Sequence, residues 1–87
     1  MSAGYRVEIA RRAVKSIQAL PKKEQQRVRA AIELLADNPR PPGCAALKGE
    51  SAAYRVRVGD YRVVYEIHDR RLLVQVVRVG HRRQIYR

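Results

Sequence analysis

Three arginines in segment 54–65 have the chemistry to hold a phosphate if they share one patch of surface. The segment reads Tyr-Arg-Val-Arg-Val-Gly-Asp-Tyr-Arg-Val-Val-Tyr, and its central Gly59-Asp60 pair is typical of a two-residue type II′ hairpin turn. That turn places Arg57 directly opposite Arg62, with Arg55 on the same side because side chains alternate along a strand. Like charges directly opposite each other destabilise a sheet. We therefore expect this patch to bind a polyanion.

The same register gathers an apolar face on the other side of the hairpin. Its members are Tyr54, Val56, Val58, Tyr61, Val63, Tyr65 and Ile67. Because the three tyrosines share this face with valines and an isoleucine, we interpret them as core residues and not as stacking surfaces for bases.

Size and charge narrow the classes of partner. We expect the 87 residues to form a single domain, 1–87. The net charge of +11 is spread over both halves of the chain, which favours nucleic acid or an acidic protein as the partner. No apolar run approaches the roughly 18 residues of a membrane span, and no secretory signal opens the chain, so we expect a cytoplasmic protein without a membrane partner. The single cysteine, Cys44, excludes an internal disulfide and a cysteine-based zinc site, and we expect no metal or cofactor.

Hydrophobic periodicity predicts two helices among several strands. The helices are expected at 10–20 and 22–37, separated by Pro21. A loop is expected at 39–46, followed by a short strand or turn at 47–49. Strands are expected at about 5–9, 53–58, 61–68 and 71–79, with Gly80 ending the last.

This order, β-α-α-β-β-β-β, predicts an α+β fold in which a helical hairpin covers one face of a mostly antiparallel, twisted sheet. The last strand is apolar on both faces, which suits a central position. An even-length turn at 68–71 would pair Arg62 with Val77. The tail that follows would then bring three residues, Arg82, Arg83 and Tyr86, to the rim of the arginine patch. Arginine binds phosphate through a planar fork, and tyrosine stacks on bases.

Three motifs resemble those of the RelE/ParE superfamily, the toxins of bacterial type II toxin–antitoxin systems. They are Leu47-Lys-Gly49, the hairpin segment 54–65 and Val79-Gly-His-Arg-Arg-Gln-Ile-Tyr86, and the resemblance covers essentially the whole chain. It is greater to the RelE branch, whose members cut mRNA in the ribosomal A site. The resemblance implies a RelE-like fold and a catalytic set at the matching positions, Arg55, Arg57, Arg62, Arg82 and Tyr86. It also suggests RNA or ribosome contacts at Lys48, Arg83 and Arg87.

The chemistry that the resemblance implies is attack by a ribose 2′-hydroxyl on the adjacent phosphate. The products are a 2′,3′-cyclic phosphate and a 5′-hydroxyl. Some RelE relatives have lysine where this chain has Arg55 or Arg57, and arginine does not deprotonate in proteins. The general base is therefore His81 or a group of the ribosome, or else alignment and charge carry most of the rate.

Two other functions fit the same motifs. One is a ParE-type inhibitor of DNA gyrase without nuclease activity, and the other is an inactive relative that still binds RNA. The arginine set with Tyr86 distinguishes the nuclease from the gyrase inhibitor, because RNA cleavage needs it and gyrase inhibition does not. The arginine-for-lysine difference leaves the inactive relative open. Apart from the ribosome and mRNA, the resemblance implies a RelB-like antitoxin whose acidic segment wraps this basic chain. Without that antitoxin we expect no direct DNA binding.

Overall fold

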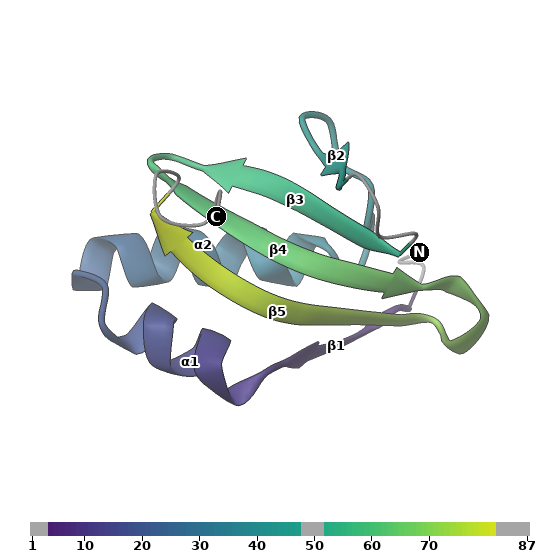
Figure 1. Cartoon of the computed structure of the whole chain (residues 1–87), viewed down its shortest axis with the longest axis horizontal. Helices are drawn as coiled ribbons and strands as arrows, with labels where there is room; N and C mark the ends of the chain where they lie inside the picture. The colour runs from purple at the N-terminus through teal and green to yellow at the C-terminus, as the bar shows by residue number, and fades with distance from the viewer. Residues whose placement is uncertain (1–3, 48–51, 82–87) are drawn as a thin grey trace.

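The computed structural model describes residues 4–47 and 52–81, and it has a five-stranded sheet with two helices on one face (Figure 1). The strands are β1 (Arg6–Ile9), β2 (Ala45–Ala46), β3 (Ala53–Val58), β4 (Tyr61–His68) and β5 (Leu73–His81). The helices are α1 (Arg11–Gln18) and α2 (Lys22–Leu34). This order of elements confirms the predicted α+β fold.

The sheet is mostly antiparallel, as predicted. Its strand order is β1-β5-β4-β3-β2, and only the β1–β5 pair is parallel. The apolar strand β5 lies between β1 and β4, which confirms its predicted inner position. The arginine-bearing strands β3 and β4 are neighbours, and the two-residue β2 covers the outer edge of β3.

Each helix turns a narrow apolar stripe toward the sheet. Helix α1 buries Ala13 and Ile17 and packs on β5, whereas α2 buries Val28 and Ile32 and packs on β3 and β4. Both helices are shorter than predicted because their last turns tighten into bonds between residues three apart, such as Asp37 N to Leu34 O at 3.1 Å. Neither described helix has the length and apolar character needed to cross a membrane.

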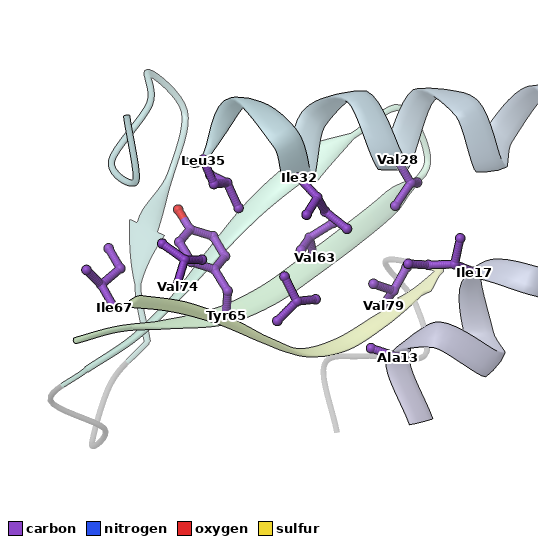
Figure 2. Packing of buried hydrophobic residues seen from close by; sticks show 11 residues of the cluster. Ala13, Ile17, Val28, Ile32, Leu35, Val63, Tyr65, Ile67, Val74 and Val79 are labelled. Carbon is purple, nitrogen blue, oxygen red and sulfur yellow. The ribbon is translucent and has the colours of Figure 1, made fainter. Parts of the chain in front are cut away.

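The core lies between the helices and the sheet, as Figure 2 shows. Its buried members are Ala13, Ile17, Val28, Ile32, Leu35, Val63, Tyr65, Ile67, Val74, Val76 and Val79. Each large aliphatic side chain removed from water contributes about 1.5–3 kcal/mol. Val63, Tyr65 and Ile67 come from the predicted apolar face of the hairpin. The other predicted members of that face, Tyr54, Val56, Val58 and Tyr61, are partly buried against this cluster.

The register predicted for the β3–β4 hairpin is confirmed at every pair. Arg57 lies opposite Arg62, Arg55 lies opposite Val64, and Tyr54 lies opposite Tyr65. Gly59 has φ +60°, and Asp60 is not among the described residues with positive φ. Positive φ at the first central residue alone is the signature of the type II′ turn.

The register predicted for the β4–β5 hairpin is wrong, because Arg62 pairs with Gly80 and not with Val77. The connecting turn lies one residue later than predicted, with a 3₁₀ turn at Asp69–Arg71 and Leu72 in the left-handed region at φ 48°. A β-bulge then adds a further shift, since Tyr65 pairs with Val76 whereas Val64 pairs with Arg78. Val77 is the extra residue.

Two predicted boundaries also change. Gly80 does not end the last strand, because β5 continues through it to His81 and keeps its pairing with Tyr61. The predicted loop 39–46 contains the short strand β2, whose Ala45 pairs with Arg55. Leu47 donates its N–H to Ala53 O at 2.9 Å, while the rest of the expected 47–49 segment lies outside the described residues.

Candidate active site

The β3–β4 turn sets the position of the arginine patch. The side chain of Arg57 folds back on this turn, where its Nε donates to Gly59 O at 3.4 Å. On the helix side, the Arg27 guanidinium of α2 lies close to the same glycine, 3.3 Å from the place that a Cβ atom would occupy. A side chain at Gly59 would therefore displace Arg27, in addition to the strain of its positive φ.

Arg55, Arg57 and Arg62 line one hollow of about 190 Å³ on the open face of the sheet, together with Gly43 and Ala45. We call it the arginine hollow. Arg57 is exposed, whereas Arg55 and Arg62 are half-buried. All the described lining residues are either cationic or small, so the hollow combines positive charge with room for a ligand. Guanidinium groups stay charged and donate paired N–H groups to phosphate oxygens.

The sequence analysis missed a fourth arginine on this face. Arg78 pairs with Val64, which shares a face with Arg62, so the Arg78 side chain leaves the sheet on the open face as well. Without the bulge at Val77, the alternation would direct Arg78 toward the helices. One signal in the sequence pointed to the bulge: Gln75 and Arg78 are three residues apart and cannot share a polar face in a regular strand.

The structure does not bring His81 to the arginine hollow. His81 pairs with Tyr61, a residue of the core face, and the two rings meet edge to face with centroids 5.8 Å apart. Together with Ser16, Ala19 and Leu20 of the α1–α2 hairpin, both rings line a separate groove of about 380 Å³. In this geometry the imidazole faces the helices, while the arginine hollow lies on the opposite face.

The second histidine is also distant from the arginine hollow. His68 Nε2 lies 3.0 Å from Glu66 Oε1, and both residues are on the open face of β4. His68 is six residues from Arg62 along the same strand, which corresponds to roughly 20 Å. The pair is therefore too far away to move a proton at a phosphate held by Arg62.

Five of the residues expected in the site lie outside the described residues. They are Lys48, Arg82, Arg83, Tyr86 and Arg87. The last described residue is His81, and its neighbour Gly80 is paired with Arg62. Within 4–47 and 52–81, no group of histidine, cysteine and acidic residues is arranged to hold a metal ion.

Comparison with known proteins gives one consistent family. The model of the family described as the ParE toxin of the type II toxin–antitoxin system, parDE, matches residues 7–86. An Escherichia coli protein named as a RelE-like toxin is 35% identical over 80 residues, which cover 90% of this chain and 83% of the relative. A Methanocaldococcus jannaschii protein named as a RelE toxin is 33% identical over 78 residues, which cover 84% and 87%.

Solved structures have the same fold. A chain of the archaeal RelE–RelB complex from Pyrococcus horikoshii superposes with a TM-score of 0.82 at 31% identity, over 91% of this chain and 96% of that chain. A chain of the RelBE2 toxin–antitoxin complex from Mycobacterium tuberculosis superposes with a TM-score of 0.80 at 25% identity, over 92% and 100%. The chain therefore belongs to the ParE toxin family of type II toxin–antitoxin systems, within the RelE/ParE superfamily that its motifs resemble.

Proposed function

We propose that this toxin is a ribosome-dependent endoribonuclease that cuts mRNA in the ribosomal A site and so inhibits translation. The observation that carries the proposal is the arginine hollow, in which Arg57 and Arg62 face each other across two strands with Arg55 alongside. Directly opposed like charges cost stability, so their presence favours an anionic ligand that offsets the repulsion.

The cleavage reaction has three requirements. The ribose 2′-hydroxyl must be aligned with the adjacent phosphorus, the added negative charge must be neutralised, and a proton must pass to the leaving 5′-oxygen. We assign Arg57 and Arg62 to the non-bridging phosphate oxygens, because they are the opposed pair in the arginine hollow. Arg55, two residues before Arg57 on the same face of β3, supports the same phosphate. Nucleophilic attack then closes the 2′,3′-cyclic phosphate and releases the 5′-hydroxyl.

Groups outside the arginine hollow must remove the proton of the 2′-hydroxyl and supply a proton to the leaving oxygen. Arginine is not a base at neutral pH, and the His81 ring lies against Tyr61 on the other face. We therefore favour a group of the ribosome as the base, or a reaction in which alignment and charge supply most of the acceleration. For Arg82 the implied role is to stabilise or protonate the leaving oxygen, and stabilisation suits an arginine, which keeps its proton. The implied role of Tyr86 is to stack on or orient a nucleobase.

The partner we propose is a RelB-like antitoxin with an acidic segment. Relatives of this chain form RelE–RelB complexes, and a net charge of +11 favours an acidic partner. An antitoxin peptide added at saturation should stop mRNA cleavage. Cleavage that continues at saturation would show that such a peptide does not cover the active site.

Primer extension on an mRNA translated in a purified system tests the nuclease. The wild-type protein should cut at codons in the A site, and Arg62→Ala should lower the cleavage rate by roughly 100-fold or more because one donor to the phosphate is lost. Growth arrest by a protein that leaves the mRNA intact would contradict the proposal. It would favour inhibition of DNA gyrase, with the arginine hollow as a docking surface.

A further inference from the structure

We propose that Arg78 binds a second phosphate of the mRNA, adjacent to the phosphate held in the arginine hollow. The inference rests on the proposed function and adds a substrate-binding residue to it. No motif in the sequence marks this position, and only the register of β5 places it on the open face.

Arg62 is the residue of the arginine hollow on β4, the strand that pairs with the strand of Arg78. The lining residues of the hollow come from the β2–β3 side and from Arg62 itself, whereas Arg78 lies on β5, the neighbour of β4 on its other side. Arg78 faces Val64, two residues beyond Arg62, and such diagonal neighbours are roughly 7–8 Å apart. Two phosphates of one strand could thus be held on either side of Arg62.

The backbone is shaped to present Arg78 on this face. The bulge at Val77 changes the alternation of side chains just before Arg78, and bulges commonly re-aim a side chain in this way. The Nε of Arg12 in α1 donates to Val77 O at 3.1 Å and so holds the carbonyl of the extra residue. The direction of the Arg78 side chain is therefore built into the contact between α1 and β5.

The surroundings of Arg78 suit an anion from outside the described residues. Arg78 is exposed, and its side chain forms no hydrogen bond or ion pair with any residue in 4–47 or 52–81. Gly80, which stands opposite Arg62 on the same face, has no side chain to fill the space beside the two arginines. A glycine in a strand often marks a place where a ligand backbone approaches closely.

A single-stranded polynucleotide fits this surface better than a peptide does. One strand carries a negative charge at every nucleotide linkage, so neighbouring phosphates could occupy two separate arginine positions at once. The alternative ligand is an acidic segment of the antitoxin. In that case Arg78→Ala would weaken the toxin–antitoxin complex and leave mRNA cleavage unchanged.

The test compares cleavage of ribosome-bound mRNA by the wild type, Arg78→Ala, Arg78→Lys and Arg70→Ala. Arg70 is a matched control, since it is an exposed arginine in the turn that precedes β5 and lies outside the proposed interface. The rate is measured against ribosome concentration at several salt concentrations. This separates the maximal rate from the half-saturating concentration and gives the salt dependence of binding.

Arg78→Ala should raise the half-saturating ribosome concentration about tenfold and leave the maximal rate within about threefold of wild type, because a bound phosphate is lost and the reacting phosphate is not. The slope of log affinity against log salt should fall by about 0.7, the value for one contact to a single strand. Arg78→Lys should keep the wild-type slope, and Arg70→Ala should match wild type throughout.

Three results would overturn the inference. If the wild type cleaves mRNA and Arg78→Ala behaves like Arg70→Ala, Arg78 does not bind the RNA, although the proposed function stands. If Arg78→Ala weakens only the antitoxin complex, the ligand is a peptide. If the wild type leaves mRNA intact, both the proposed function and the second phosphate site fail.

Discussion

The β3–β4 hairpin runs the length of the sheet (Figure 1), and its two ends use arginine in opposite ways. At the end where β3 begins, Arg40 donates to both carboxylate oxygens of Asp69, at 3.3 and 2.9 Å. Its Nε donates to the Tyr54 hydroxyl at 3.2 Å, and Tyr5 donates its own hydroxyl to Asp69 at 2.6 Å. We call these four residues the Arg40 cluster. At the other end, Arg57 faces Arg62 across the strands, beside the turn.

The contrast separates an arginine that holds the fold together from the arginines that we propose bind the substrate. In the Arg40 cluster the positive charge is matched by a carboxylate, and the contacts join the loop after α2 to the turn after β4. In the arginine hollow, three cations are placed on one small area of sheet. The first arrangement stabilises the folded chain, whereas the direct opposition of Arg57 and Arg62 in the second works against stability. Charge reversal should therefore have opposite effects at the two ends.

Arg62→Glu should have the largest effect on activity. The substitution removes a hydrogen-bond donor to the phosphate and adds a carboxylate that repels it. The rate of mRNA cleavage should therefore fall on the order of 1,000-fold. The same carboxylate would stand opposite Arg57, and a pair of opposite charges across strands contributes about 0.2–1 kcal/mol. Urea denaturation should therefore show unchanged or higher stability while the cleavage assay shows inactivity.

The matched control is Arg70→Glu, which makes the same change in net charge in the turn before β5. It should leave cleavage close to wild type. Equal losses of activity in both variants would mean that overall charge steers the toxin to the ribosome. The arginine hollow would then not be the catalytic site.

Whether the register of each hairpin could be predicted from the sequence depended on the turn that connects its two strands. The Gly59-Asp60 pair has one favoured hairpin geometry, so the register of β3–β4 and the Arg57–Arg62 pair followed from two residues. The turn at Asp69–Leu72 has no such signature, since its left-handed residue is Leu72 and not a glycine or asparagine. Packing of β5 beneath α1 fixes that register, and it involves contacts distant in sequence.

In the candidate site, too, the residues set by local alternation were predicted correctly and those set by the register of β5 were not. Arg55, Arg57 and Arg62 were found because local alternation places them together, and the structure joins them in one hollow. Arg78 was missed because a bulge in β5 reverses its side. His81 was expected near the patch because the predicted register ended β5 too early, and its pairing with Tyr61 turns it toward the helices. Errors of register thus moved β5 residues from one face to the other.

A smaller effect is expected from Tyr65→Phe, which tests the structural end of the comparison. The fully buried Tyr65 donates its hydroxyl to Pro39 O at 2.8 Å, and Pro39 directly precedes Arg40. Removing the hydroxyl leaves a buried carbonyl without this donor, at a cost of about 1–3 kcal/mol. Urea denaturation should show this loss.

Cleavage by folded Tyr65→Phe should stay within about twofold of wild type, because Tyr65 lies on the core face of β4 and the arginine hollow lies on the opposite face. A large loss of cleavage in a variant that remains folded would mean that the two ends are coupled. The distinction between structural and functional arginines would then be incorrect.

The smallest effect is the contribution of the Arg40 cluster to stability at low pH. Hydrogen bonds from Arg40 and then from Tyr5 lower the pKa of Asp69 to about 2. A carboxyl whose pKa is lower in the folded than in the unfolded chain binds its proton more readily when unfolded. Its contribution is therefore fully present above the unfolded pKa, near 4, and is lost as the pH falls toward 2.

Asp69→Asn should consequently have a shallower loss of stability between pH 4 and pH 2 than the wild type, measured as the urea midpoint at each pH. Arg40→Ala should be shallower in the same window, because it removes the main cause of the lowered pKa. The double variant should be no shallower than Asp69→Asn alone, since both changes act on one carboxyl. Parallel curves for all four proteins would mean that Arg40 and Asp69 touch without contributing to stability, as many exposed ion pairs do. The arginines of the Arg40 cluster and of the arginine hollow would then differ in position but not in their contribution to the stability of the fold.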